Sequence, residues 1–150
     1  MPVFFVPSEC IASPTISIAG DLLIHLRDSL RITAGEIVLF GDGASHRYRT
    51  EITEVSKRAI TGRILETVQE PPRHSLRLIL GQSLLKGEKM DWVIQKAVEL
   101  GVDELVPVES RHSVVQLRAD RIDSQIARWQ RIALEAAQQS EQWHLPTIAQ

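Results

Sequence analysis

The pair Pro71-Pro72 divides this 150-residue sequence into two segments that follow different patterns. Two consecutive prolines stiffen the backbone and remove two hydrogen-bond donors, which is typical of a linker. Before the pair, short apolar and β-branched runs predict mainly strands. After it, a strand, a helix and another strand follow one another. The break therefore predicts two domains, over residues 1–72 and 73–150.

The first segment has the pattern of a small β-barrel interrupted by one helix. Strands are predicted over residues 3–6, 15–18, 36–40, 48–55 and 59–68. Asp42-Gly43, between two of them, is a typical hairpin sequence. The helix is predicted over residues 21–30, because four leucines share one of its faces. These are Leu22, Leu23, Leu26 and Leu30.

The second segment predicts an α/β domain. Strands are predicted over residues 76–80, 104–108 and 147–149, and helices over residues 88–100 and 120–139. Strand, helix and strand in this order form a βαβ unit, which builds a parallel sheet. Parallel sheets need helices on both faces and usually more than two strands. The segment is therefore expected to be the opening part of an α/β domain.

The helix over residues 88–100 has an apolar face that excludes its tryptophan. The face consists of Met90, Val93, Ile94, Ala97 and Val98, at the spacing of one buried stripe. Trp92 falls on the flank with Lys89 and Lys96, three residues before it and four after it. We therefore predict that Trp92 is not a core residue. The face of the later helix is expected to hold Ile122, Ile126, Trp129, Ala133 and Ala136 or Ala137.

The composition, 43% hydrophobic and 24% charged, is that of a folded globular protein. Cys10 is the single cysteine, so an internal disulfide is excluded, and it has no basic neighbour that would activate its thiol. The five histidines are scattered, so no metal site is expected. No apolar stretch could span a bilayer, and the N-terminus lacks the features of a secretion signal. The expected compartment is the cytoplasm.

The charge distribution gives one candidate basic patch. The net charge is −2, so nucleic-acid binding would need a local concentration of cations. Residues 71–96 carry five basic side chains, Arg73, Arg77, Lys86, Lys89 and Lys96, against Glu88 and Asp91. On charge alone, a solvated surface is the simpler interpretation of this segment.

The segment from Gly81 to Met90 connects a predicted strand to a predicted helix. Loops at the carboxyl ends of parallel strands are where α/β domains place ligand chemistry. This one holds Gln82, Ser83, Lys86 and Lys89, and the start of a helix favours an anion such as an RNA phosphate. The spacing is not that of a P-loop, so a nucleotide triphosphatase is not supported. Physical chemistry alone also leaves a solvated loop as an interpretation.

The same segment resembles a known family. Gly81-Gln82, Lys86-Gly87-Glu88-Lys89-Met90, Ile94-Gln95-Lys96 and Glu99-Leu100-Gly101-Val102 are similar to the signature of the RsmE family. These are 16S rRNA uridine-N3 methyltransferases of the SPOUT superfamily. Weaker similarities extend over the chain in the same order. They are His25, Leu30-Arg31, Gly35, Asp42-Gly43, Pro107-Val-Glu-Ser-Arg111, Ala136 to Ser140, Pro146 and Ile148.

The sequence also departs from the family pattern. Gln138 stands where the family often has Glu, and Glu141 and Gln142 stand where Gly and Arg are common. The family's Gly-Pro-Glu-Gly-Gly turn and Leu-Arg-x-Glu-Thr-Ala run do not occur in these 150 residues. In the family these motifs build the trefoil knot that holds S-adenosylmethionine. The chain is therefore expected to stop before the knot and to be inactive alone.

The resemblance implies a PUA-like RNA-binding barrel over residues 1–72 and a SPOUT methyltransferase domain that begins near Arg73. It implies a homodimer that transfers a methyl group from S-adenosylmethionine to N3 of a uridine in 16S rRNA, without a metal. The residues expected to contact RNA are His25, Arg31, Gln82, Lys86, Lys89 and Arg111. No catalytic base is assigned.

Two other functions fit the same residues. One is a non-catalytic RNA-binding or ribosome-associated module. The other is an unrelated α/β enzyme that holds a phosphorylated small molecule in the loop from Gln82 to Lys89.

Overall fold

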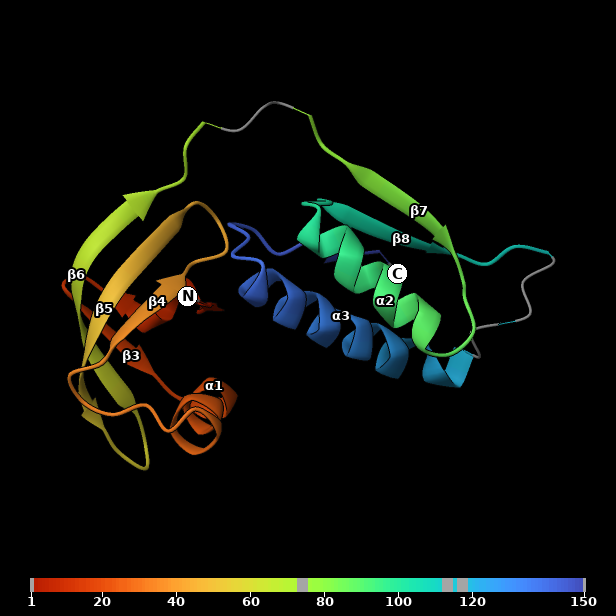
Figure 1. Cartoon of the computed structure of the whole chain (residues 1–150). Coiled ribbons are helices and arrows are strands. Elements are labelled where there is room, and N and C mark those ends of the chain that lie inside the picture. Colours follow the sequence, from red (N-terminus) through yellow and green to blue (C-terminus); the bar gives the residue numbers. More distant parts are fainter. Residues whose placement is uncertain (1, 73–75, 112–114, 116–118, 150) are drawn as a thin grey trace. The chain divides into compact units, whose positions relative to one another are not determined.

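The computed structural model describes residues 2–72, 76–111, 115 and 119–149 (Figure 1). The chain forms two compact units, Met1–Pro72 and Arg73–Gln150, and each is described by itself. Within the described residues, no helix has the length and apolar character needed to cross a membrane.

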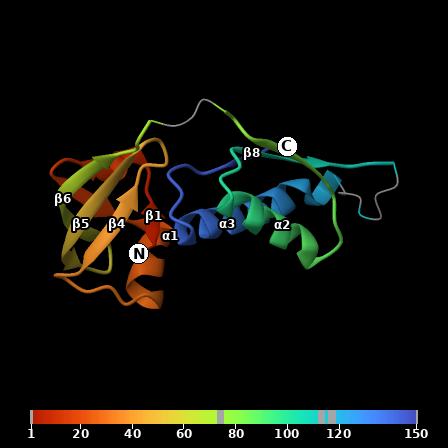
Figure 2. The ribbon, with the colours of Figure 1, turned by 45° about the horizontal axis from the view of Figure 1, so that its top comes forward.

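The first unit is a curled six-stranded sheet, a half-barrel, with one helical segment (Figures 1 and 2). The strand order is β1-β4-β5-β6-β3-β2, in which β1 and β4 are parallel and the other pairs are antiparallel. This confirms the predicted PUA-like barrel class. The elements are β1 (Val3–Phe5), a 3-10 helix (Ser8–Cys10), β2 (Ile11–Ala12), β3 (Thr15–Ile18), α1 (Gly20–Ile24), a π-helix (His25–Ser29), β4 (Ile37–Gly41), β5 (His46–Val55) and β6 (Ile60–Gln69).

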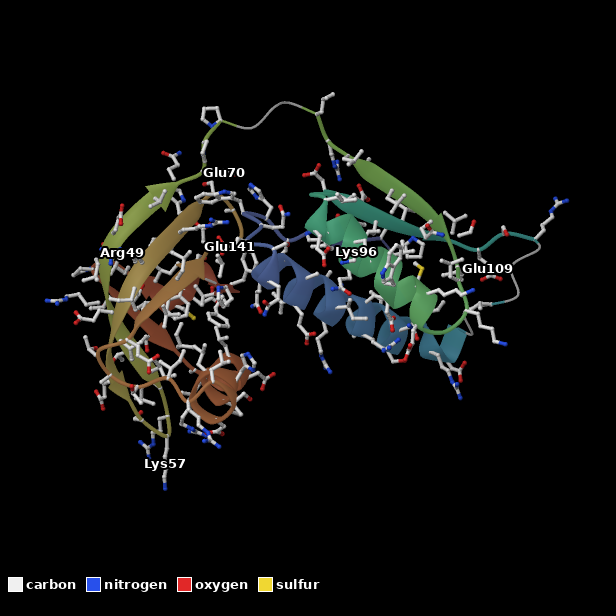
Figure 3. The ribbon with its side chains drawn as sticks, viewed as in Figure 1. Arg49, Lys57, Glu70, Lys96, Glu109 and Glu141 are labelled. Carbon is white, nitrogen blue, oxygen red and sulfur yellow. The ribbon has the colours of Figure 1, made fainter. Side chains whose placement is uncertain are left out.

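Alternating burial along the strands builds the core of this unit. In β3, Ile16 and Ile18 are buried while Thr15 and Ser17 are exposed, as expected for a sheet with one face on the core. Outward-facing side chains of neighbouring strands form ion pairs, such as the bond from Arg49 Nε on β5 to Glu66 Oε2 on β6, at 3.2 Å (Arg49 is labelled in Figure 3). The polar and apolar faces are thus separated as the pattern predicts.

Gly62 of β6 lies where the backbone and side chains of neighbouring strands approach very closely. A Cβ atom at this position would lie 2.5 Å from Cγ2 of Thr50 and 3.0 Å from the carbonyl oxygen of Glu51. Neither backbone nor the buried Thr50 has room to move away. A glycine inside a strand is therefore required here by close packing.

The predicted helix over residues 21–30 is two different helices. After the short α1, residues His25–Ser29 form a π-helix, in which Leu30 N–H donates to the carbonyl of His25 at 3.1 Å. The wider turn rotates later residues away from the α-helical face. Leu23 and Leu26 are buried as expected, but Leu22 is only half-buried and Leu30 is 47% exposed. The prediction that Leu30 completes the apolar face is wrong for this reason.

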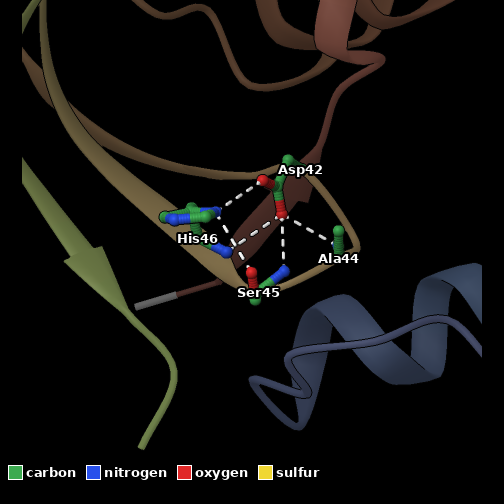
Figure 4. Close-up of polar contacts among 4 residues, drawn as sticks. All are labelled: Asp42, Ala44, Ser45 and His46. Carbon is green, nitrogen blue, oxygen red and sulfur yellow. Dashed lines mark hydrogen bonds and ion pairs between the residues drawn. The ribbon is translucent and has the colours of Figure 1, made fainter.

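Asp42 organises the hairpin turn between β4 and β5 (Figure 4). Its Oδ1 accepts hydrogen bonds from the backbone N–H groups of Ala44, Ser45 and His46, at 2.8, 2.9 and 3.0 Å. Its Oδ2 lies 3.1 Å from Nδ1 of His46. Gly43 adopts a φ of 70°, which glycine allows without strain. The Asp-Gly sequence therefore forms the predicted hairpin, with Asp42 to Ser45 between the strands.

The second unit is a three-stranded parallel sheet with two helices on one of its faces (Figures 1 and 2). Its order is β7-β8-β9, with both neighbouring pairs parallel. This confirms the predicted α/β architecture. The elements are β7 (Ile79–Ser83), α2 (Glu88–Glu99), β8 (Glu104–Val108), a 3-10 helix (Ala119–Arg121), α3 (Ile122–Gln139) and β9 (Thr147–Ile148).

The two helices bury the predicted faces. The buried residues are Met90, Ile94, Ala97 and Val98 of α2, and Ile126, Trp129, Ala133, Ala136 and Ala137 of α3. Val93 and Ile122, which were also expected there, are half-buried. Trp92 is 61% exposed, which confirms that it is not a core residue.

The first strand of this unit lies three residues later than predicted. Pairing with β8 runs from Ile79 to Ser83, so Gly81, Gln82 and Ser83 belong to the strand and not to the loop after it. Leu78 N–H instead donates to the Asp103 carboxylate at 2.8 Å. Leu76 is 88% exposed. The apolar run over residues 76–80 therefore predicted the strand but not its register.

Candidate functional site

The segment between β7 and α2 presents two lysines. Leu84 is buried after the strand, Lys86 is exposed, and Gly87 opens α2 with a φ of 62°. Lys89 lies in the first turn of the helix and is also exposed. Neither lysine has a carboxylate partner among the described residues. Both ammonium groups are thus available to a bound anion.

Arg111 lies at the same edge of the sheet as these lysines. β7 and β8 run parallel, with Ser83 opposite Val108, so the segments that follow them leave from one edge. Arg111 comes three residues after Val108 and is exposed. The topology therefore brings the three cations predicted for the second unit to the carboxyl end of the sheet, where α/β folds place ligand sites. His112, the next residue, lies outside the described residues.

Gln82 has a local role in this structure. It is half-buried in β7, and its Nε2 donates to the carbonyl of Ser83 at 2.9 Å. This contact fixes the side chain beside the end of the strand, just before the lysine segment.

His25 and Arg31 flank the π-helix of the first unit. The His25 ring is exposed and lies 6.2 Å from the Phe4 ring, centroid to centroid, at an interplanar angle of 60°. Arg31 is exposed and has a φ of 54°, a left-handed conformation that is uncommon for a residue other than glycine. The bond from Ile32 N–H to the carbonyl of Leu26, at 3.0 Å, closes the helix around it. The Arg31 side chain is therefore presented at a strained helix end.

Several other basic side chains are engaged by carboxylates. Arg63 donates to Glu51 at 2.7 Å and Arg77 to Glu104 at 2.6 Å, while Lys96 lies 2.7 Å from Glu99. Arg77 and Lys96 belong to the basic patch predicted over residues 71–96, and Arg73 lies outside the described residues. The patch is accordingly reduced to Lys86 and Lys89. The exposed cations without a carboxylate partner in the described part of the chain are Arg31, Lys57, Arg58, Lys86, Lys89, Arg111, Arg121 and Arg131.

A pocket of about 250 Å³ lies between the helix starts of the second unit. Its lining is mainly apolar and includes Leu84, Leu85, Met90 and Trp129. Arg128 also lines it, but its guanidinium is held by the Asp91 carboxylate through two bonds, at 3.0 and 2.5 Å. Lys86 and Lys89 do not line the pocket. A phosphorylated small molecule would therefore find no free cation there.

No sequence pattern indicated the pair of Arg128 and Asp91, because 37 residues separate them.

A metal site was not indicated by the sequence, and among the described residues no three His, Cys, Asp or Glu side chains gather closely enough to hold a metal ion. Burial, helped by Glu9, raises the pKa of the Cys10 thiol, which disfavours the reactive thiolate.

Two family models cover most of the chain. Residues 18–65 match the RNA methyltransferase PUA domain, and residues 72–150 match the RNA methyltransferase domain. Ribosomal RNA small subunit methyltransferase E of Bacillus subtilis (strain 168) is 29% identical over 136 residues, which are 91% of this chain and 53% of that protein. The chain belongs to the RsmE family.

Further members of the RsmE family agree with this assignment. The enzyme of the same name from Synechocystis sp. is 29% identical over 144 residues, 96% of this chain and 46% of that protein. The crystal structure of the Neisseria gonorrhoeae enzyme bound to S-adenosyl methionine has a TM-score of 0.85 at 30% identity, covering 99% of this chain and 60% of that one. The chain thus spans about half the length of the curated RsmE relatives.

Proposed function

We propose that the protein methylates N3 of a uridine in 16S rRNA of the small ribosomal subunit, with S-adenosylmethionine as the methyl donor. The single observation that carries this proposal is the match of residues 72–150 to the RNA methyltransferase domain. The names of the relatives, and the S-adenosyl methionine bound to the Neisseria enzyme, support it. A homodimer in the cytoplasm follows from the same resemblance and stays a prediction.

The free cations at the carboxyl edge of the parallel sheet support a role in RNA binding. Lys86, Lys89 and Arg111 face solvent without carboxylate partners in the described residues. Phosphate contacts of this kind supply most of the affinity for RNA and set its orientation, but they carry no sequence information. We assign the three residues to the rRNA backbone.

His25, Arg31 and Gln82 are assigned supporting roles. The guanidinium of Arg31 would contact a phosphate from the end of the π-helix. His25 can donate or accept a hydrogen bond beside it, and Gln82 orients the start of the lysine segment through Ser83. A non-glycine residue in the left-handed region lowers the free energy of unfolding by on the order of 1 kcal/mol. Arginine at position 31 therefore makes the fold less stable than glycine would there.

The reaction sets demands on how rRNA is held. Uracil N3 must lose its proton, and the base must leave its stack before a methyl group can reach it. Holding the nucleotide in line with the donor supplies a large part of such a rate enhancement. The residues named above act in this step by fixing the RNA backbone.

The described residues do not by themselves form a site that fits S-adenosylmethionine. The pocket of about 250 Å³ is smaller than the roughly 300–1,000 Å³ of typical ligand sites, and its Arg128 is engaged. A second pocket, of about 350 Å³, is lined mainly by apolar atoms of Ala133, Leu134, Leu145 and Pro146. The polar side chains of the two linings are few: Glu88, Gln125 and the engaged Arg128 in the first pocket, and Gln130 and Arg131 in the second. No reaction step is assigned to donor-binding residues within this chain.

The test is methyl transfer in vitro by the protein expressed from its complete gene. Small subunits that lack the modification are incubated with S-adenosylmethionine, and the nucleosides of their rRNA are analysed by mass spectrometry. The proposal expects 3-methyluridine at one position, with a strongly reduced yield for Lys86→Ala/Lys89→Ala and an unchanged yield for Arg63→Ala. RNA binding without any methylated nucleoside would instead identify a non-catalytic RNA-binding module.

A further inference from the structure

The turn between β5 and β6 brings two unpaired cations next to the π-helix of the first unit. Nη1 of Arg27, in the π-helix, donates to the backbone carbonyl of Lys57 at 3.3 Å, although thirty residues separate them. The same guanidinium is held by both oxygens of Asp28, at 2.6 and 2.8 Å. Arg27 therefore fixes the position of the turn relative to the helix, while its own charge is neutralised.

Ser56 makes the turn rigid. Its Oγ accepts hydrogen bonds from the N–H groups of Arg58 and Ala59, at 3.3 and 3.0 Å, and donates to the carbonyl of Ala59 at 2.8 Å. The turn closes with a bond from Ser56 N–H to the same carbonyl, at 2.9 Å. All of these contacts use the Ser56 side chain and backbone atoms. The side chains of Lys57 and Arg58 are not needed for the turn to form.

Lys57 and Arg58 project from this fixed turn into solvent (Lys57 is labelled in Figure 3). Neither has a carboxylate partner among the described residues. Arg31, about one helical turn after Arg27, adds a third free cation at the end of the π-helix. The helix and the turn together carry four basic side chains against the single carboxylate of Asp28. The rest of this unit is predominantly acidic, so this surface is locally positive on a chain of net charge −2.

We propose that Lys57 and Arg58, positioned by Arg27 and extended by Arg31, form a second contact surface for RNA phosphates. We call these four residues the turn patch. The proposal rests on the proposed function, because it takes the polyanion to be RNA. It extends that function by adding Lys57 and Arg58 to the phosphate contact already proposed for Arg31 in the first unit, in addition to the lysines of the β7–α2 segment. Two anchoring surfaces would fix the orientation of the RNA as well as its affinity.

The test measures binding of a short fluorescein-labelled RNA hairpin by fluorescence anisotropy over a range of salt concentrations. Four proteins are compared: the parent, Lys57→Ala/Arg58→Ala, Arg49→Ala/Arg63→Ala and Lys86→Ala/Lys89→Ala. The second double variant is the matched control, because it removes two arginines from β5 and β6, the strands that flank the turn, and both are engaged by glutamates. All three double variants change the net charge equally, and circular dichroism confirms that each is folded.

Removal of Lys57 and Arg58 is expected to lower the affinity at least several-fold. The slope of log affinity against log salt should fall by about 0.7–0.9 for each lost phosphate contact, while the matched control keeps the slope of the parent. Equal RNA affinities and salt slopes of the parent and Lys57→Ala/Arg58→Ala would contradict RNA binding by the turn patch. Equal losses of affinity in that variant and in the matched control would also contradict it, because the effect would then come from net charge alone.

The Lys86→Ala/Lys89→Ala variant separates this proposal from the proposed function. If only that variant binds RNA more weakly than the parent, RNA binding by the turn patch is contradicted and RNA binding by Lys86 and Lys89 is supported. If only Lys57→Ala/Arg58→Ala binds more weakly, RNA binding by the turn patch is supported and RNA binding by the two lysines is contradicted. A parent protein that binds no RNA would overturn both.

Discussion

Asp42 shows at the scale of one residue how the sequence specifies a turn and its pH dependence. Burial raises the pKa of this carboxyl group, but hydrogen bonds from the backbone of His46, Ser45 and Ala44, and from the His46 ring, outweigh it and lower the pKa to about 2. The unfolded chain has an ordinary value near 3.8. Because the folded pKa is the lower one, the stabilisation is present above about pH 4 and is lost as the pH falls toward about 2.

We predict that Asp42→Ala lowers the free energy of unfolding at pH 7 by about 2 kcal/mol, the amount that this pKa difference represents. Urea denaturation of the parent and the variant at about pH 7 and at about pH 2.5 measures it. The difference between the two proteins should shrink at the lower pH. Glu54→Gln, at an exposed position on β5, serves as the control. A difference that stayed constant with pH would contradict the role of the ionised carboxylate.

The basic residues of the proposed RNA site could be named from the sequence, but the sequence did not show which of them are free of carboxylate partners. The family pattern singled out Arg31, Lys86, Lys89 and Arg111. Which arginines are held by carboxylates depends on strand register and on helix packing, as for Arg63 with Glu51 across two strands. Residues far apart in sequence decide these pairs. The contact that places the Lys57–Arg58 turn beside the π-helix likewise joins residues thirty positions apart.

A single-residue prediction follows for the lysine segment. Lys86→Ala or Lys89→Ala should each weaken RNA binding and reduce the salt slope by about one unit per lost phosphate contact. Arg63→Ala should do neither, because its guanidinium is already paired with Glu51. Salt titrations of the four proteins by anisotropy measure the slopes. Identical slopes in all four would mean that the lysines are solvated surface only.

At the scale of elements, periodicity predicted the helices and strands better than their ends. β3 and β8 have the predicted bounds, and α2 begins at the predicted Glu88. The π-helix was not predicted, since leucine spacing cannot distinguish a π turn from an α turn over so short a segment. β7 was predicted three residues too early. The residue just before β7, Leu78, donates its N–H to the carboxylate of Asp103, which lies just before β8 and 25 residues away in the sequence.

Helix α2 and helix α3 each carry a tryptophan, and the two should respond differently to substitution. Trp129 is 3% exposed and Trp92 is 61% exposed. We predict that Trp129→Phe lowers the free energy of unfolding by about 1–3 kcal/mol, while Trp92→Phe changes it by less than about 0.5 kcal/mol. Urea denaturation followed by circular dichroism measures both. A comparable loss in the two variants would show that α2 buries its outer face.

At the scale of the whole molecule, the two units belong to different structural classes. The family match assigns the first to the PUA class and the second to the methyltransferase domain. Both helices of the second unit cover the same face of its sheet in the described residues (Figure 2). Parallel sheets are usually covered on both faces, and Ile79 and Val108 remain 51% and 41% exposed. The presence of two structural classes in one chain was predictable from the change of sequence pattern at Pro71-Pro72.

The 150-residue chain alone is predicted not to bind S-adenosylmethionine appreciably. The glycine-rich turn of the family does not occur in it, and the two pockets described above have mainly apolar linings. Calorimetric titration of the folded chain with the cofactor should give no saturable heat. A site with micromolar affinity would refute this prediction and would place donor-binding residues within these 150 positions.

The proposed methylation is tested most directly in cells. The gene that encodes this chain is deleted from its source organism, and the nucleosides of the small-subunit rRNA are analysed by mass spectrometry before and after the gene is restored. We expect one 3-methyluridine to disappear from the rRNA in the deletion strain and to return with the parent gene. An unchanged amount of 3-methyluridine in the deletion strain would contradict the proposed function.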